Sequence, residues 1–131
     1  MVDISFVDIR NALNKFVLPD VDCVIGIAEG GLVPAILAAF KLGCELKTIK
    51  INLRDENNNP RYENPKILQS LKEEIRNKKI LLVDDVSVTG KTLEAAKSLF
   101  PNNTITTFAM KGKADLVLFP EIKECVNWPW K

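Results

Sequence analysis

The residues best suited to chemistry lie between Ile80 and Leu93. An apolar run there ends in two adjacent acids, Asp84 and Asp85, and a short loop of serine, threonine and glycine then leads into a predicted helix. The amides and hydroxyls of such a loop, together with the positive end of the helix, can bind a phosphate. The two carboxylates can accept hydrogen bonds from sugar hydroxyls or hold a magnesium ion. The segment therefore predicts a site for a phosphorylated sugar.

Two other interpretations of this segment fit it less well. The run from Thr89 to Thr92 (TGKT) matches the end of a nucleotide P-loop, but the first glycine of that motif would fall on Asp85, where an acid would repel phosphate. Alternatively, the acids only end a strand and the loop only caps a helix. That interpretation leaves the coincidence of acids, hydroxyls and glycine at one strand end without a reason, so we favour the phosphate site.

The composition excludes several classes of function. The chain has no histidine, which rules out mechanisms built on an imidazole. Eighteen basic and seventeen acidic residues give a net charge of +1, so we expect no general attraction to nucleic acid or to a membrane surface. Three widely spaced cysteines indicate neither a disulfide framework nor a zinc site. With no signal-peptide pattern and no long apolar run, the sequence predicts a cytoplasmic protein.

The elements that must position this site alternate along the 131 residues, which form a single domain. A polar stretch at residues 54–64 predicts a mobile loop. Alternating strands and helices of this length predict an α/β fold, an open parallel sheet flanked by helices, with ligands beyond the carboxyl ends of the strands. Apolar spacing and breakers predict helices over residues 6–16, 32–42, 65–77 and 90–99, and strands over residues 23–28, 47–52, 79–84, 104–110 and 115–119.

The segment VDDVSVTGKTL closely resembles the 5-phosphoribosyl-1-pyrophosphate (PRPP) signature of type I phosphoribosyltransferases. The resemblance implies a pentosyltransferase that moves the phosphoribosyl group from PRPP to a nucleobase, expected to be a purine, and releases pyrophosphate, with Mg²⁺ as cofactor. It implies that Asp84 and Asp85 are the catalytic and metal-binding acids and hold the ribose hydroxyls. The other PRPP-binding residues that it implies are Glu29, Gly30, Gly31, Ser87, Val88, Thr89, Gly90, Lys91 and Thr92. We also expect a homodimer.

The end of the chain is similar to the small hood of xanthine-guanine-type members, which implies base contacts from Lys111 and Trp128. Both residues also have simpler interpretations, a solvated strand end for Lys111 and a sheet cover for Trp128. Two positions depart from the family pattern. Val88 stands where 6-oxopurine enzymes carry an aspartate, and Glu29 stands where purine enzymes often carry a basic residue. These departures favour the alternative function, a non-catalytic regulatory module that binds PRPP or a nucleotide.

Overall fold

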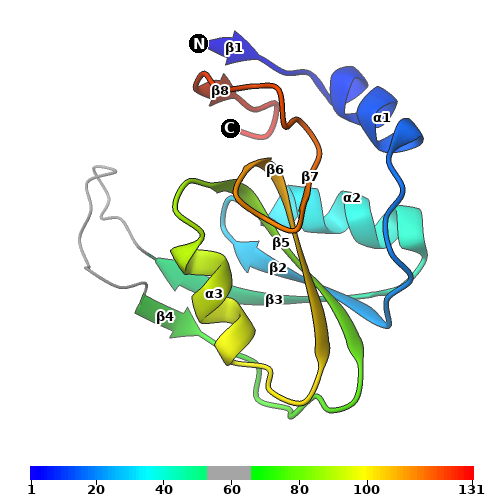
Figure 1. Cartoon of the computed structure of the whole chain (residues 1–131), viewed down its shortest axis with the longest axis vertical. Helices are drawn as coiled ribbons and strands as arrows, with labels where there is room; N and C mark the ends of the chain where they lie inside the picture. Colours follow the sequence, from blue (N-terminus) through cyan, green and yellow to red (C-terminus); the bar gives the residue numbers. More distant parts are fainter. Residues whose placement is uncertain (53–65) are drawn as a thin grey trace.

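A computed structural model describes residues 1–52 and 66–131 (Figure 1). Its main sheet has six strands in the order β4-β3-β2-β5-β6-β7; β4 runs antiparallel to β3, and the other neighbours are parallel. The α/β fold class expected from the sequence is confirmed. The bounds of these strands are β2 Cys23–Ala28, β3 Glu45–Asn52, β4 Lys66–Gln69, β5 Lys79–Ser87, β6 Thr104–Gly112 and β7 Leu116–Val117.

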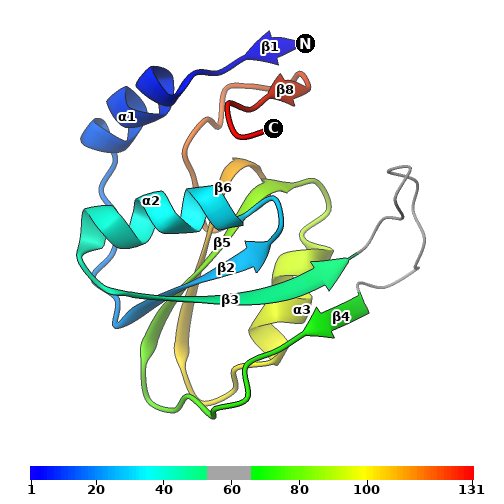
Figure 2. The same ribbon diagram turned by 180° about the vertical axis from the view of Figure 1, so that it is seen from behind.

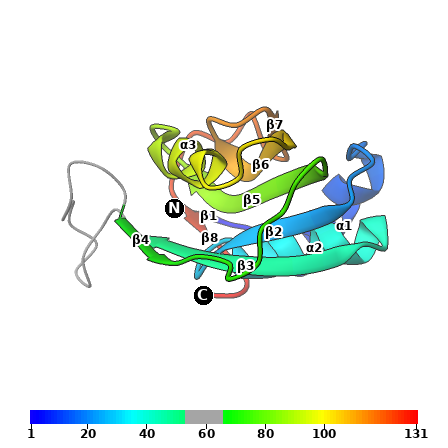
Figure 3. The ribbon, with the colours of Figure 1, turned by 90° about the horizontal axis from the view of Figure 1, so that it is seen from below.

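The described part of the chain has three helices, which cover the two faces of the sheet (Figure 3). Helix α1 (Phe6–Lys15) and helix α2 (Leu32–Leu42) lie on one side, and α3 (Lys91–Ser98) lies on the other. Ser5 begins α1 through a capping box, in which its hydroxyl accepts from the Asp8 amide at 3.1 Å and the Asp8 carboxylate accepts from the Ser5 amide at 2.8 Å. Gly43 ends α2 in the left-handed region, with φ +67°, which glycine adopts without strain.

The two faces of the sheet carry separate apolar clusters. One joins Ile9 and Leu13 of α1, Ala35 of α2 and the strand residues Leu81 and Val83. The other packs α3, through Leu93 and Ala96, onto the opposite side chains of β2, β3 and β5. Because β5 is buried on both faces, its side chains are packed from both sides. This packing also fixes the start of the loop that leads from β5 into α3.

A small hood closes one end of the molecule (Figures 1 and 2). Its two-stranded parallel sheet pairs β1 (Val2–Asp3) with β8 (Val126–Asn127), so segments from both ends of the sequence lie side by side. Trp128 follows β8, is 2% exposed, and stacks on Trp130 with ring centroids 5.2 Å apart and an interplanar angle of 7°. Such packing fixes the backbone around these two tryptophans against the first apolar cluster.

The helix predicted over residues 65–77 is wrong for its described part. Residues 66–69 form β4 at the edge of the sheet, and the chain after Gln69 is irregular. The prediction relied on Ile67, Leu71 and Ile75, which are spaced by four residues. A spacing of four puts side chains on one face of a strand as well as of a helix, so the pattern did not distinguish them. The predicted loop at residues 54–64 lies outside the described residues.

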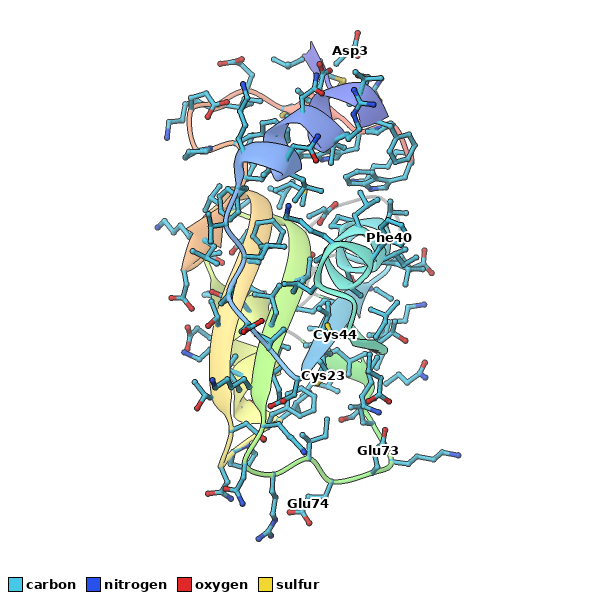
Figure 4. The ribbon with its side chains drawn as sticks, turned by 90° about the vertical axis from the view of Figure 1, so that its right-hand side faces the viewer. Asp3, Cys23, Phe40, Cys44, Glu73 and Glu74 are labelled. Carbon is cyan, nitrogen blue, oxygen red and sulfur yellow. The ribbon has the colours of Figure 1, made fainter. Side chains whose placement is uncertain are left out.

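Within residues 1–52 and 66–131, no helix has the length and apolar character needed to cross a bilayer. Cys23, Cys44 and Cys125 are free thiols, and burial raises the pKa of Cys23 and of Cys44. Figure 4 shows Cys23 and Cys44 on the sheet and its neighbouring loop, away from the hood. A raised thiol pKa keeps these two side chains in the unreactive protonated form at neutral pH.

Candidate active site

A polar pocket of about 340 Å³ opens at the carboxyl ends of β2 and β5. These strands are neighbours at the point where the strand order reverses, with β2-β3-β4 on one side and β5-β6-β7 on the other. Ligand sites of open α/β sheets lie at such reversal points. The pocket is lined by Ile27, Ala28, Glu29, Gly30, Ile51, Asn52, Asp84, Asp85, Val86, Ser87, Val88, Thr89, Gly90, Thr92 and Lys131. The structure therefore brings together most of the residues that the sequence suggested.

The acidic pair lies inside β5 rather than at its carboxyl end. β5 continues three residues beyond the predicted end because Asp84 and Val86 pair with β6. Both carboxylates are buried, and each accepts a hydrogen bond from the next backbone amide, Asp84 from the Asp85 N–H at 2.9 Å and Asp85 from the Val86 N–H at 2.8 Å. Burial raises the pKa of Asp84 well above its usual range, and the charge of Asp85 raises it further. Asp84 thus lies in a poorly solvated position beside a second carboxylate, where its charged form is disfavoured, and a metal cation would relieve that penalty.

The loop between β5 and α3 offers hydroxyl and amide groups. Ser87 is buried, and its Oγ finds no hydrogen-bond partner among the residues that the structure describes. A buried hydroxyl normally has a partner, so an unpaired one that lines a pocket indicates a ligand position. Gly90 is the N-cap that precedes α3, and its φ of +86° is a backbone conformation that strains other residues. Thr89 Oγ1 accepts from the Lys91 amide at 3.3 Å, which orders the start of the helix.

The glycines at the end of β2 permit close approach to the acidic strand. A Cβ on Gly31 would lie 2.6 Å from the Val83 carbonyl oxygen and 2.9 Å from Asp84 Cα. A Cβ on Gly30 would lie 2.5 Å from an Asp85 carboxylate oxygen. Only Gly30 of the two lines the pocket. Gly31 therefore seats α2 against β5, whereas Gly30 leaves room for the Asp85 carboxylate.

Glu29 is joined to Ala28 by a cis peptide bond, and its side chain lies beside that of Lys50. Its carboxylate forms an ion pair with Lys50 of β3 at 3.2 Å, and its side chain is 82% exposed. A carboxylate at this position would repel a phosphate, and the Lys50 cation on the adjacent strand partly offsets that repulsion.

The remaining predicted residues lie around the pocket. Val88 lines it and is 65% exposed, so its side chain contributes to the pocket wall rather than to the core. Lys91 begins α3, and the pocket wall in the described chain does not include it. Lys111 donates to the backbone carbonyls of Lys123 and Glu124 and so ties β6 to the hood. Trp128 lies in the hood core, and its base contact, like that of Lys111, stays a prediction.

Lys131 is a site residue that the sequence did not suggest. Its ammonium lies 3.2 Å from Asp85 Oδ2, and its side chain lines the pocket. The two residues are far apart in the chain and share no local motif, so only the folded hood brings them together. The hood therefore places the positive charge of Lys131 beside the acidic pair.

The donor set fits a magnesium ion that also has substrate oxygens as ligands. Residues 1–52 and 66–131 contain no group of three or more side chains able to hold a metal alone. Mg²⁺ commonly uses one or two carboxylates plus phosphate oxygens and water, and Asp84 and Asp85 supply such carboxylates at the pocket wall. The acids suit a metal that arrives with a phosphorylated ligand.

The sequence and the fold resemble known proteins of one kind. A family model for the phosphoribosyl transferase domain matches residues 8–106. An orotate phosphoribosyltransferase of Sulfurisphaera tokodaii is 34% identical over 88 residues, which are 67% of this chain and 40% of that protein. The chain thus spans about 40% of the length of this curated relative.

Solved structures extend the likeness over almost the whole chain. A purine phosphoribosyltransferase from Pyrococcus horikoshii matches with a TM-score of 0.77 and 27% identity, covering 99% of this chain and 93% of that one. A protein from Neisseria gonorrhoeae with bound ppGpp matches with a TM-score of 0.70 and 25% identity, over 98% and 89%. A xanthine-guanine-hypoxanthine phosphoribosyltransferase from Helicobacter pylori, at 16% identity and a TM-score of 0.72 over 98% and 90%, shares the fold.

Proposed function

This chain belongs to the phosphoribosyl transferase domain family, and we propose that it transfers the 5-phosphoribosyl group of PRPP to a nucleobase. The observation that carries the proposal is one pocket lined both by the buried acids Asp84 and Asp85 and by Ser87, whose buried hydroxyl has no partner among the described residues. Sugar hydroxyls fit the acids, and a phosphate fits the hydroxyls and amides of the loop from Ser87 to Thr92. Both halves of PRPP thus have matching groups in the pocket.

The proposed reaction needs positioning more than covalent chemistry. The bond between the ribose carbon and the pyrophosphate oxygen breaks, a bond from that carbon to a base nitrogen forms, and the base loses a proton. Positive charge develops on the ribose ring as pyrophosphate leaves, and the carboxylates of Asp84 and Asp85 lie at the wall where they stabilise it. Gly30 leaves space for the Asp85 carboxylate beside the departing group. Bound Mg²⁺ would neutralise pyrophosphate charge.

We propose a purine as the accepting base, supported by the 27% identity to the Pyrococcus purine enzyme over most of both chains. Val88 limits which purine is turned over quickly, because valine cannot take the proton that an aspartate at this position takes from a 6-oxopurine. General acid–base help is worth roughly a hundred- to ten-thousand-fold in rate. We expect slow turnover of guanine and hypoxanthine, and an increase in Val88→Asp.

A second candidate is a regulatory module that binds PRPP or a nucleotide without turnover. It is favoured by Glu29 at the pocket rim and by Val88, which together weaken pyrophosphate binding and remove a base-activating acid. The Neisseria protein, whose structure contains bound ppGpp, supports nucleotide binding by this fold. Binding of PRPP without consumption of it by any base would favour this second function.

We also propose that the protein acts as a homodimer in the cytoplasm. The support for a dimer is an apolar groove of about 500 Å³ between α1 and α2, which is lined by Phe6, Val7, Leu37 and Phe40 among others. Phe40 is 88% exposed and sits on α2 (Figure 4). Apolar side chains gathered at this density commonly mark a protein interface.

The deciding experiment is an assay of pyrophosphate release with PRPP, Mg²⁺ and a panel of adenine, guanine, hypoxanthine, xanthine, uracil and orotate. We expect release with one purine, and none from the double variant Asp84→Asn with Asp85→Asn. Asp20→Asn, which removes an exposed carboxylate that precedes β2, at the opposite end of that strand from the pocket, is the matched control and should keep wild-type rates. Release only with orotate or uracil would refute the purine proposal, and no release with any base would refute the transferase.

A further inference from the structure

Lys131 reaches the proposed substrate pocket from the hood. Its ammonium lies 3.2 Å from Asp85 Oδ2, and the side chains of Lys131 and Asp85 are 54% and 12% exposed. Lys131 also lines the same pocket as the unpaired Ser87 hydroxyl. The contact therefore lies within the ligand site and is not a salt bridge of the outer surface.

The hood holds Lys131 in place through its neighbours. The Lys131 amide donates to the Trp128 carbonyl at 3.2 Å, and Trp128 is buried in the first apolar cluster. Trp130, immediately before Lys131, stacks on Trp128. A backbone fixed by two packed tryptophans limits where the lysine side chain can go, so its position beside Asp85 follows from the fold of the hood.

Lys131 carries a positive charge in a pocket whose other described charged residues are acids. Glu29, Asp84 and Asp85 line the pocket, and among the described residues that line it Lys131 alone is positively charged. The Asp85 oxygen that contacts the ammonium is one of the oxygens that a metal at the acidic pair would use. An ammonium and a divalent ion cannot share that oxygen closely, because the two positive charges repel each other.

We propose that Lys131 is the counter-ion of Asp85 in the ligand-free pocket and competes with the divalent metal for that carboxylate. The proposal rests on the proposed function, in which the acidic pair holds Mg²⁺. Metal binding releases the ammonium from Asp85, which leaves the positive group of the hood free to face an anionic ligand. Metal binding at Asp85 is thereby linked to the position of the Lys131 side chain in the hood.

The expected size of the competition follows from the exposure of the pair. Because the Lys131 side chain is 54% exposed, water screens the pair and we expect it to stabilise by about 0.2–1 kcal/mol, which corresponds to roughly a one-and-a-half- to fivefold change in affinity. Removing the lysine charge should therefore tighten metal binding by a few-fold, because the metal no longer has to displace it.

The test measures Mn²⁺ binding by electron paramagnetic resonance, with Mg²⁺ as competitor and without PRPP. Lys131→Met should bind the metal a few-fold more tightly than the wild type, whereas Lys131→Arg, which keeps the charge, should bind it like the wild type. Lys123→Met is the matched control, since Lys123 is another hood lysine whose ammonium contacts the Pro120 carbonyl and does not line the pocket. Its metal affinity should not change.

Tryptophan fluorescence gives a second readout, because both tryptophans of the sequence lie within three residues of Lys131. Metal should change the emission of the wild type as the lysine is released, and should leave the emission of Lys131→Met unchanged although that variant binds the metal. Unchanged or weaker metal binding by Lys131→Met, or no metal binding by the wild type, would overturn the proposal. If PRPP is consumed while Lys131→Met binds metal like the wild type, the competition fails and the transferase stands. Tighter metal binding by Lys131→Met together with no consumption of PRPP would support the competition and reject the transferase.

Discussion

Replacing Asp84 by asparagine should stabilise the ligand-free protein at neutral pH while removing the proposed transferase activity. Asp84 is buried beside Asp85, and its Oδ1 accepts from the Asp85 amide at 2.9 Å. Asparagine has nearly the same shape and keeps an oxygen for that hydrogen bond, but it carries no charge. The substitution thus removes the electrostatic penalty and preserves the contact.

The sign of the pH dependence follows from the raised pKa of Asp84, whose largest cause is burial. Between the unfolded value of 3.8 and the higher folded value, the folded state holds a proton that the unfolded state has released. The wild-type free energy of unfolding therefore falls as pH rises through this window. One proton gives a slope of up to about 1.4 kcal/mol per pH unit, and above the folded pKa the whole penalty is present.

Urea denaturation of both proteins in EDTA, from pH 4 to pH 8, measures this effect. The free-energy difference between Asp84→Asn and the wild type should be largest at pH 8 and shrink towards pH 4, with a slope no steeper than about 1.4 kcal/mol per pH unit. Asp20→Asn should follow the wild type at every pH. A less stable Asp84→Asn at pH 8, or a difference that does not vary with pH, would show that Asp84 stabilises the fold as a carboxylate and would refute the reasoning.

Three further predictions concern the pocket rim and the α1–α2 groove. Gly30→Ala should place a methyl group 2.5 Å from Asp85 and weaken PRPP binding by at least tenfold in calorimetry, with a smaller loss of stability; unchanged affinity would mean that Asp85 can move freely. Glu29→Gln should free the Lys50 ammonium and tighten pyrophosphate binding a few-fold, an effect that shrinks as salt rises; weaker binding would assign a metal or loop-ordering role to Glu29. Phe40→Asp should convert the expected dimer to a monomer in sedimentation experiments, and a wild type that is already monomeric would exclude this interface.

Local patterns were enough to predict the elements that hold the site. The apolar run of β2 and the glycine at the end of α2 are signals within a few residues, and the structure confirms both elements with the predicted bounds. The segment around Asp84 and Asp85 likewise predicts a strand, a loop and a helix in that order, as observed. In each case, the side chains that decide the structure are neighbours in sequence.

What could not be predicted depends on contacts between distant segments. The extension of β5 through its acids needs β6 as a hydrogen-bonding partner, and two adjacent acids by themselves indicate a strand end. The short strands β1 and β8 exist only because they pair with each other. The ion pair of Lys131 with Asp85 needs the hood to be folded, and no spacing rule connects residues at that separation.

The contrast between Gly112 and Val88 determines where this pocket can change during evolution or in a designed library. Gly112 pairs with Ser87, has φ +105°, and a Cβ there would lie 2.0 Å from the Ser87 carbonyl oxygen, so every other residue would push the loop aside. Val88 is next to Ser87, yet its side chain projects from the loop with little packed against it. Substitutions at Gly112 should therefore disrupt the pocket, whereas substitutions at Val88 should be tolerated by the fold. New ligand preferences can be selected at Val88 without a prior gain in stability, because the change leaves the core as it was.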